Sequence, residues 1–373
     1  MPTAKFPLFH HATGQWAKKI RGRTVYFGTD KTDALKRYRS QAAELHAGRR
    51  PRTANGELTI RELCNQFLTM KLRRVEAGEL AKVTWYSYWC TCDRLTGELG
   101  KHRLVEDLAA GDFERLRAEI ASTCGPAGLR TAMIRTRTVF KFAFDSGLID
   151  RPLRLGMSFQ VPSARAIRKA RQNAGDRMIE PADLQRLIAE GRQPIRAMIL
   201  LGLNCAFGQT DIANLPAVAV DLDGGWVRFP RVKTAIDRRC PLWPETVDAV
   251  REAIAIRPEA KAHGDEELVF LTVKGARWVR MIARKSDGIE QPMDALAPRF
   301  RGTLKAAGLT PRGFYVLRHI FRTVADECRD EPAVDLIMGH LQKGIAASYR
   351  ERIEDRRLHA VVQYVRDWVF KKT

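Results

Sequence analysis

Hydrophobic residues recur at three- and four-residue intervals through much of the chain, which is the spacing of one face of an α-helix. The first such run begins at Ile60, behind Thr59 and Glu62, which have the spacing of a helix-starting capping box. The pattern as a whole predicts an all-helical domain over residues 58–154. Its helical runs are Ile60, Leu63 and Phe67; Trp85, Tyr88, Trp89, Cys92 and Leu95; Phe113, Leu116 and Ile120 behind the N-cap candidate Asp112; and the segment 129–144.

Strand-like patterns are short and few. Two lie near the N-terminus, at residues 15–20 and 24–27, and an Arg-Gly turn joins them. A helical pattern starts at about residue 32. Residues 1–52 are therefore expected to form a small β-β-α module in which Lys and Arg outnumber the acids. This module is either an arm that binds DNA or a solvated basic hairpin.

The C-terminal half has mainly helical patterns, which are interrupted by one strand pair at residues 226–229 and 239–242. We expect residues 178–373 to form one mainly α domain with a small β-sheet. Residues 155–177 are rich in arginine, poor in apolar side chains and without a strong period. This composition predicts an extended basic linker between the two domains.

The charge of the chain limits what it binds. The formal net charge is +21 and the sequence pI is about 10.0, and an excess of this size attracts polyanions through counterion release. Double-stranded DNA is the expected partner. A membrane surface is the competing partner, but the longest mostly apolar run, residues 198–207, is much shorter than the ~20 residues that cross a bilayer. The N-terminus also lacks the apolar segment of a signal peptide.

Metal and nucleotide motifs are missing from the sequence. The seven cysteines do not have zinc-finger spacing, so we expect free thiols in a reducing cytoplasm. There is no phosphate-binding Walker loop, no His-Glu-x-x-His helix and no GxGxxG fingerprint. Chemistry on a phosphate would then use cationic side chains, because phosphoryl transfer depends mainly on positioning and electrostatics. No cofactor is expected.

Two groups of cations are candidates for contacts with DNA phosphates. One group shares a face of the helix predicted over residues 129–144, whose opposite face is apolar, and the other lies in the basic linker. A charged helix face is also often just solvated, so both interpretations stay open. The groups are Arg130, Arg137 and Lys141 in the helix, and Arg165, Arg168 and Lys169 in the linker.

Residues that could act on a phosphate are concentrated between residues 313 and 349. Arg318 offers paired donors that match phosphate geometry, and His340 follows in a Met-Gly-His turn. Tyr349 is a potential nucleophile, although a free phenol has a pKa of about 10 and needs nearby cations to react near neutrality. Each residue alone would also fit a surface ion pair, a helix cap or a core position.

Six motifs together resemble those of the tyrosine recombinases of the phage-integrase family. LTIRELCNQFL and FKFAFDSGLIDRPL resemble the two ends of the family's helical, SAM-like core-binding domain. GQTDIANLP is similar to the helix with the first catalytic arginine, RVKTAIDRRCPL to the hairpin with the catalytic lysine, YVLRHIF to the second-arginine motif and IMGHLQKGIAASY to the final box. The resemblance implies a core-binding domain and a catalytic domain that clamp DNA, behind an N-terminal module similar to the family's arm-type domains.

The resemblance implies a role for each matching residue. Tyr349 would attack the scissile phosphate and form a 3′-phosphotyrosyl link, while Arg318 holds the non-bridging oxygens. Lys233 would donate a proton to the departing 5′ oxygen, and His340 would hydrogen-bond the phosphate. Tyr315 stands where the family usually has a histidine, and its phenol can also hydrogen-bond. The implied function is site-specific DNA recombination and integration, for a mobile element or phage, without metal or ATP.

One position departs from the family's pattern. Gapless alignment puts Gly208 where the family has its first arginine, and a glycine neither clamps nor neutralises a phosphate. Losing such a donor typically costs about 10²–10³ in rate. Either another cation reaches the phosphate, or Gln209 supplies a weaker donor, or the chain binds DNA and no longer cuts it. The candidate cations are Arg238, Arg239, Arg277, Arg280 and Arg299.

The C-terminal segment has an apolar stripe at helical spacing, made of Leu358, Val361, Val365 and Trp368. The stripe either packs on its own domain or docks on a neighbouring protomer, as C-terminal segments of the resembling family often do. The resemblance implies a homo-oligomer, a tetramer on DNA, joined through this helix.

Two alternatives to a recombinase remain. One is a non-catalytic DNA-binding protein of the same fold, such as an architectural factor or a repressor. The other is a relaxing enzyme like the type IB topoisomerases, with the same nucleophile and no preferred site. All three would be cytoplasmic, and the resemblance implies a nucleoid-associated protein of bacterial or phage origin.

Overall fold

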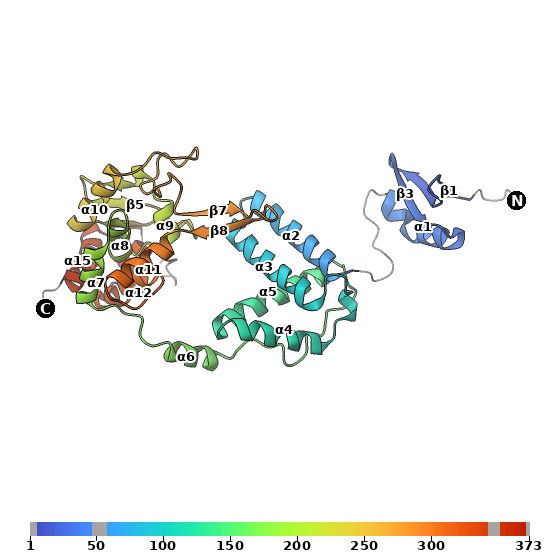
Figure 1. Ribbon diagram of the computed structural model, residues 1–373, viewed down its shortest axis with the longest axis horizontal. Coiled ribbons are helices and arrows are strands. Elements are labelled where there is room, and N and C mark those ends of the chain that lie inside the picture. The colour runs from blue at the N-terminus through green and yellow to red at the C-terminus, as the bar shows by residue number, and fades with distance from the viewer. Residues whose placement is uncertain (1–5, 47–57, 342–350, 371–373) are drawn as a thin grey trace. The chain divides into compact units, whose positions relative to one another are not determined.

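The computed structural model describes residues 6–46, 58–341 and 351–370 (Figure 1). The chain divides into two compact units, Met1–Ala174 and Gly175–Thr373. The hydrophobic side chains form three separate cores, two in the first unit and one in the second. As predicted, the protein is mainly helical with small antiparallel sheets. No helix in the described part of the chain is both long and apolar enough to cross a membrane.

The N-terminal module packs one helix on a three-stranded antiparallel sheet with strand order β1-β2-β3. The turn between β2 and β3 uses Arg21 and Gly22, which both have positive φ angles, 49° and 81°. The prediction of two strands and a helix is confirmed, but it missed β1, because two residues are too few to show a period-two pattern. The elements are β1 (Phe9–His10), β2 (Trp16–Ile20), β3 (Arg23–Gly28) and α1 (Lys31–His46).

The second core of the first unit joins four helices, as the spacing of apolar residues predicted. The capping box is confirmed: the Glu62 amide donates to Thr59 Oγ1 over 3.2 Å, and the Thr59 amide donates to Glu62 Oε2 over 3.0 Å. Asp112 is not the N-cap of its helix. It is the third helical residue, and its carboxylate reaches back to the Ala109 amide over 2.9 Å. The elements are α2 (Ile60–Glu76), α3 (Lys82–Leu99), η1 (Val105–Asp107), α4 (Ala110–Thr123) and α5 (Pro126–Asp145).

The basic linker is not extended throughout. Residues Ala164–Asn173 form helix α6, which Ser163 caps by accepting a hydrogen bond from the Ala166 amide over 3.2 Å. Before it, Phe159 is fully buried in the core of the helical domain. The prediction failed because α6 has no buried residue: only Ala166, Ile167 and Ala170 mark its inner face, and they are partly buried.

The second unit contains a three-stranded antiparallel sheet, β4-β5-β6, and a separate β7-β8 hairpin among its helices. Strands β5 and β6 confirm the predicted pair, with Trp226 opposite Pro241. The elements are α7 (Pro181–Glu190), α8 (Ile195–Asn204), α9 (Gln209–Ala213), η2 (Ala217–Ala219), β4 (Val220–Asp221), β5 (Trp226–Arg228), β6 (Arg239–Pro241), α10 (Pro244–Ala255), β7 (Val279–Ala283), β8 (Glu290–Asp294), α11 (Leu296–Ala306), α12 (Val316–Ala325), η3 (Asp326–Cys328), α13 (Glu331–Met338) and α15 (Asp355–Phe370).

Helix α8 is the centre of the second unit. Almost all of its residues are buried, and α7, α10, α11, α12 and α15 contact it (Figure 1). Gly202 allows α12 to approach closely: a Cβ at Gly202 would lie 2.8 Å from Cδ1 of Leu317. Because Leu317 precedes Arg318, this contact fixes the start of α12 against the end of α8.

The apolar stripe near the C-terminus packs on its own unit. Leu358, Val361 and Val365 are buried in the core of the second unit, and Trp368 is partly buried against it. The indole of Trp243 donates to the Val362 carbonyl over 2.8 Å. Of the two alternatives for this stripe, the structure therefore shows packing on its own unit, where the same side chains complete the core.

Candidate active site

Arg318 is a buried cation at the start of α12, with 2% of its surface exposed. Its Nη1 donates to the Ala206 carbonyl over 2.6 Å, and its Nη2 donates to the Met338 carbonyl over 2.8 Å. These two acceptors follow α8 and end α13. The guanidinium therefore has a fixed orientation between two helix C-termini, whose carbonyl dipoles favour a positive charge.

His340 pairs with Arg318 and extends the site. Its Nε2 lies 2.8 Å from Arg318 Nη2, and its Nδ1 lies 3.3 Å from Asp335 Oδ1. A guanidinium only donates hydrogen bonds, so Nε2 is the acceptor and the ring proton sits on Nδ1, toward the carboxylate. Arg322 donates to the same carboxylate oxygen over 2.9 Å. Asp335 therefore fixes the tautomer and the orientation of His340.

Burial and neighbouring charges shift both pKa values downward. Burial, followed by the charge of Arg231, lowers the pKa of Arg318 to about 10, so this residue remains a cation near neutrality. Burial, followed by the charge of Arg318, lowers the pKa of His340 below its usual 6.5, although its hydrogen bond to Asp335 opposes the shift. His340 is thus a neutral acceptor at neutral pH.

Gly208 lies beside these residues at the N-terminus of α9. Its amide donates to Asp211 Oδ2 over 2.9 Å, and the Ala206 carbonyl that holds Arg318 is two residues away. A Cβ at Gly208 would meet nothing closer than Asp211 Oδ2 at 3.5 Å and the Tyr315 ring at 3.7 Å, which are ordinary contacts. The position expected for the first arginine therefore has room for a side chain next to the Arg318 site.

Arg238 is the one candidate replacement cation that lies at this site. Its Nη2 is 2.9 Å from Asp211 Oδ1, its Nε donates to the Phe229 carbonyl over 2.7 Å, and its guanidinium carbon lies 4.0 Å from the Phe207 ring centroid. Burial lowers its pKa, and the charge of Asp211 opposes that shift. Arg238 is a buried structural cation whose charge is balanced by its carboxylate.

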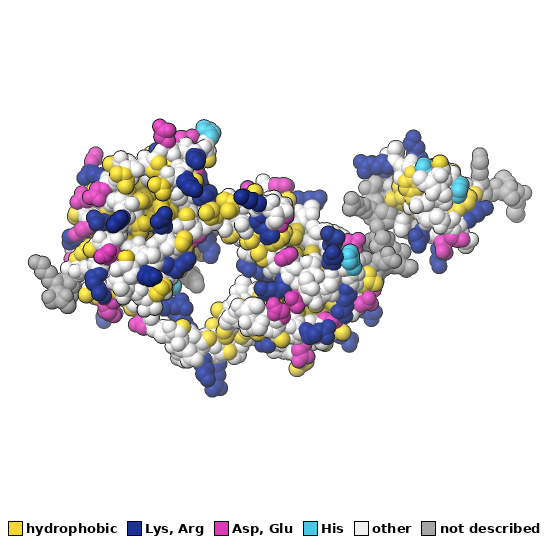
Figure 2. Space-filling model, in the orientation of Figure 1, with side chains coloured by type: hydrophobic (Ala, Val, Ile, Leu, Met, Phe, Trp, Pro, Cys, Tyr) yellow, Lys and Arg dark blue, Asp and Glu magenta, His cyan; other side chains and the backbone are white. Residues whose placement is uncertain are grey.

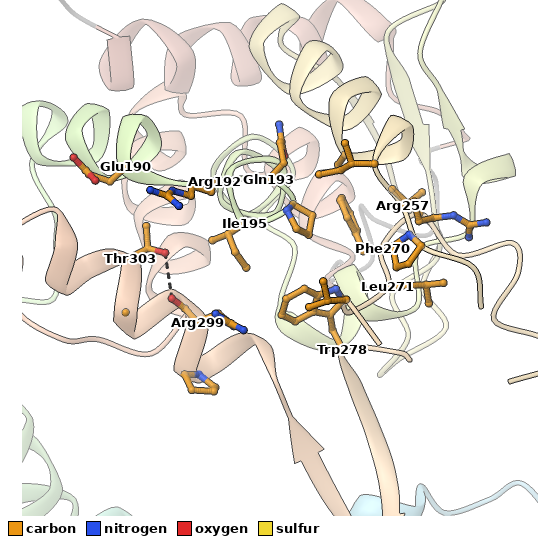
Figure 3. Close-up of a pocket in the computed structure, with 18 of the residues that line it drawn as sticks. Glu190, Arg192, Gln193, Ile195, Arg257, Phe270, Leu271, Trp278, Arg299 and Thr303 are labelled. Atoms are coloured by element: carbon orange, nitrogen blue, oxygen red, sulfur yellow. Dashed lines mark hydrogen bonds between the residues drawn. The ribbon is translucent and has the colours of Figure 1, made fainter. Parts of the chain in front are cut away.

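The remaining candidate donors either line a separate cavity or bond to other partners. Arg299 lies on α11 beside a cavity of about 650 Å³ that Trp278 also lines, and none of Gly208, Arg318 and His340 lines this cavity (Figure 3). Gln209 donates to Asp294 over 3.1 Å. The others have these partners: Arg239 pairs with Asp355, Arg277 Nε donates to Asp265 over 3.0 Å, and Arg280 donates to the Arg277 carbonyl over 2.7 Å.

Lys233 and Tyr315 are the exposed members of the predicted set. Lys233 is at the tip of the hairpin loop that the Arg231 amide closes by donating to the Ile236 carbonyl over 2.8 Å. Tyr315 is 43% exposed, directly before α12, and its ring faces Gly208. The predicted nucleophile, Tyr349, lies outside the described residues.

The predicted DNA-contact residues differ in their surroundings. Arg130 is exposed on α5, whereas Arg137 donates to the Phe159 carbonyl and Lys141 pairs with Asp145 over 2.7 Å. In the linker group, Arg165, Arg168 and Lys169 are all exposed, and their spacing puts them on one side of α6. Figure 2 shows Lys and Arg side chains spread over the visible surface of both units.

Two residues at the site were missing from the sequence prediction. Asp335 is five residues before His340, and an acidic residue at that spacing is an available signal for a histidine partner. Arg231 is two residues before Lys233 in the same hairpin, where a second cation is a weaker signal. Only the folded unit brings the hairpin to the Met-Gly-His turn.

Comparisons with known proteins agree with this geometry. Residues 177–356 match the model of the Phage integrase family. A search of curated proteins gave no match.

Similar folds occur in solved integrase structures. One is a lambda integrase tetramer bound to a Holliday junction, with a TM-score of 0.54, 13% identity, and coverage of 94% of this chain and 98% of that one. Another is a lambda integrase dimer bound to a COC′ core site, with a TM-score of 0.53, 13% identity, and coverage of 95% and 99%. A third is a Tn1549 transposon integrase in complex with transposon right end DNA, with a TM-score of 0.55, 13% identity, and coverage of 82% and 99%. At these identities the likeness establishes the fold.

Proposed function

We propose that this chain is a site-specific DNA recombinase of the integrase type, which cuts and rejoins double-stranded DNA through a 3′-phosphotyrosyl intermediate on Tyr349. The observation that carries the proposal is the contact between buried Arg318 and partly buried His340, which lies beside the N-terminus of α9 in a unit with an integrase fold. The formal net charge of +21 supports a polyanionic substrate.

In the proposed reaction, the phenolic oxygen of Tyr349 bonds to the scissile phosphorus while the bond from phosphorus to the 5′ oxygen breaks. Arg318 donates to a non-bridging oxygen, and its charge offsets the negative charge of the transition state. Lys233 gives a proton to the departing 5′ oxygen. Attack by the 5′ hydroxyl of another strand reverses the step, so the phosphoester is conserved without metal, ATP or another cofactor.

Because Nε2 of His340 is an acceptor, we assign His340 to proton transfer instead of the expected hydrogen bond to the phosphate, and Tyr315 to hydrogen bonding at the phosphate. The Nε2 lone pair of His340 points at Arg318, where it can accept the phenolic proton of the nucleophile once DNA displaces this contact. Tyr315 flanks Gly208 with an exposed phenol ring, which can donate to a phosphate oxygen.

DNA binding is assigned to the cations outside this site. Arg165, Arg168 and Lys169 on α6 have the exposure that phosphate contacts need, as does Arg130 on α5. Arg137 and Lys141 would have to exchange their internal partners for phosphates. The N-terminal module would act as an arm on the same DNA, and the chain would work on the nucleoid in the cytoplasm as a homo-oligomer, a tetramer during strand exchange, joined by surfaces other than the buried stripe of α15.

Covalent capture of DNA tests this function. A binding site can be selected from a library of randomised duplexes and rebuilt with a nick beside the scissile phosphate. After cleavage, the short fragment that carries the new 5′ hydroxyl diffuses away, so the adduct accumulates. We expect the wild-type chain to form an adduct that survives denaturant. Tyr349→Phe should form none and should retain wild-type affinity, because it loses only the nucleophilic oxygen. An adduct in Tyr349→Phe would refute the assignment of the nucleophile.

A non-catalytic DNA-binding protein is the second candidate, and Gly208 favours it, because this position lacks the cation that the family's pattern has there. This candidate predicts the same selected site and no adduct with the wild-type chain. Relaxation of supercoiled plasmid without any preferred site would instead indicate a topoisomerase-like enzyme.

A further inference from the structure

We propose that Arg231 supplies the guanidinium that position 208 lacks, and that it binds the scissile phosphate together with Arg318. The inference rests on the proposed function and adds a catalytic residue to it. Arg231 lies in the hairpin loop after β5, which also carries Lys233. It is therefore a cation from a different element than α9, serving the same phosphate.

The backbone of the Met-Gly-His turn places Arg231 at the site. Gly339 ends α13 with a φ of +62°, and a Cβ built on it would lie 2.9 Å from the Arg231 Cβ and 3.3 Å from its Cδ. The stem of Arg231 therefore runs along Gly339. The next residue, His340, contacts Arg318 over 2.8 Å. The hairpin thus reaches the Arg318 site through a contact that only a glycine permits.

Arg231 and Arg238 differ in whether a carboxylate of the described chain offsets their positive charge. Both stems approach Gly339, since the Arg238 Cδ is 3.4 Å from the same built Cβ. Arg238 is paired with Asp211 over 2.9 Å and is 2% exposed. Among the described residues, no carboxylate lies within ion-pair distance of Arg231, which is partly exposed. A phosphate would therefore gain more from Arg231 than from Arg238.

Electrostatics gives the same picture of the cluster. The charge of Arg231 lowers the pKa of Arg318 and of His340, so it is close enough to both to oppose their protonation. Like charges held together in this way are unfavourable without an anion between them. The cluster of Arg231, Arg318 and His340 therefore favours binding of an anion such as a phosphate.

The role proposed for Arg231 involves no proton transfer. Its guanidinium would donate to a non-bridging oxygen while Tyr349 displaces the 5′ oxygen, and it would remain protonated throughout. Paired donors on two arginines match the oxygens of one phosphate. The contribution expected of one such donor is about 10²–10³ in rate.

The first test needs no DNA. NMR titration of the labelled histidines of the full chain should show that Arg231→Ala raises the pKa of His340, because a nearby positive charge is removed. Arg228→Ala is the matched control, since Arg228 is an exposed arginine on β5 of the same hairpin. An unchanged His340 pKa in Arg231→Ala would place Arg231 away from the site and overturn the inference.

The second test measures covalent capture on the nicked duplex described above. Arg231→Ala should form the adduct about 10²–10³ times more slowly than the wild-type chain, while its Kd for the intact site changes only a few-fold. Arg231→Lys should be intermediate, because lysine keeps the charge and loses the paired donors. Arg228→Ala should keep the wild-type rate. A wild-type rate in Arg231→Ala would overturn the inference and leave the proposed function intact.

An arginine introduced at position 208 distinguishes two explanations of a slow Arg231→Ala variant: loss of a cation and damage to the fold. Gly208→Arg in the Arg231→Ala background should recover much of the rate, since position 208 has room for a side chain beside Tyr315. A double variant as slow as Arg231→Ala, with wild-type thermal stability in both, would count against a shared role. If the wild-type chain itself forms no adduct on its selected site, the proposed function fails first.

Discussion

At the residue scale, hydrogen bonds within the protein orient the charged groups of the site. Arg318 is 2% exposed, and its Nη atoms contact two backbone carbonyls and His340. Asp335 takes the opposite side of His340. The Arg318 guanidinium and the His340 ring are therefore oriented without DNA, and the proposed reaction would use this preorganisation to stabilise its transition state.

The free energy of unfolding should decrease at pH values below 6.5, the usual pKa of histidine, because of His340. Its pKa is lowered from 6.5 in the folded chain by burial and by Arg318, whereas the unfolded chain has the ordinary value. Above pH 6.5 both states are neutral and the contribution is complete. As the pH falls below 6.5, the unfolded chain binds the proton first, so the folded state loses stability.

Urea unfolding of the full chain at a series of pH values measures this effect. His340→Asn should lose less unfolding free energy than the wild-type chain between about pH 7 and pH 5. His263→Asn is the control, since His263 has an exposed side chain in the same unit, and it should follow the wild-type dependence. An equally steep loss in His340→Asn would mean that another group carries the pH dependence.

At the element scale, helix ends and one hairpin bring the site together. Gly202 lets α12 approach α8, the positive φ of Gly339 turns the chain from α13 toward His340, and Gly208 begins α9. Gly202 and Gly339 lie at close approaches where a larger residue would move the charged groups, and Gly339 also has a backbone angle that favours glycine.

Replacing Gly339 tests this arrangement. Gly339→Ala should lower the unfolding free energy by about 1–2 kcal/mol, because a left-handed φ is unfavourable for alanine. The contact of 2.9 Å with the Arg231 Cβ would also push the hairpin away and slow covalent capture. Gly302→Ala is the matched control: Gly302 lies inside α11 with no atom within 4 Å of its built Cβ, so this variant should be at least as stable as wild type. Wild-type stability in Gly339→Ala would contradict the account.

The sequence patterns predicted helices and strands more accurately than they predicted contacts between side chains. The capping box at Thr59 and the strand pair around Trp226 were found because their signals are local. Helix α6 and strand β1 were missed, since α6 has no buried residue and β1 has only two residues. The partners of the buried arginines are far away in the chain, as with Arg238 and Asp211 or Arg318 and the Ala206 carbonyl, and no local pattern contains that information.

At the scale of the whole molecule, the dominant property is positive charge. The formal net charge is +21, and Lys and Arg side chains lie on the visible surface of both units (Figure 2). Charge that is distributed in this way favours contact with a long polyanion over binding of a small anion at one point. Composition alone predicted this partner class, while it carried no information on the stripe of α15, which the folded unit uses for its own core.

DNA affinity should therefore fall steeply with salt. For about 6–10 neutralised phosphates, binding should weaken by about 10³–10⁵ between about 50 and 200 mM salt. Replacing Arg165, Arg168 and Lys169 together with glutamine should make the dependence shallower by about one unit of slope for each phosphate that the variant no longer neutralises. Arg251→Gln is the control, since Arg251 is paired with Asp223 over 2.9 Å, and its slope should be that of wild type. A flat salt response would argue against DNA as the substrate.

The most direct test of the central claim is to identify the residue that DNA is linked to. The adduct formed on the nicked duplex is digested with a protease and a nuclease, and the peptide that retains a nucleotide is sequenced by mass spectrometry. The account predicts a single modified peptide with the nucleotide on Tyr349. A nucleotide on any other residue, or a wild-type chain that binds its selected site and forms no adduct, would contradict it.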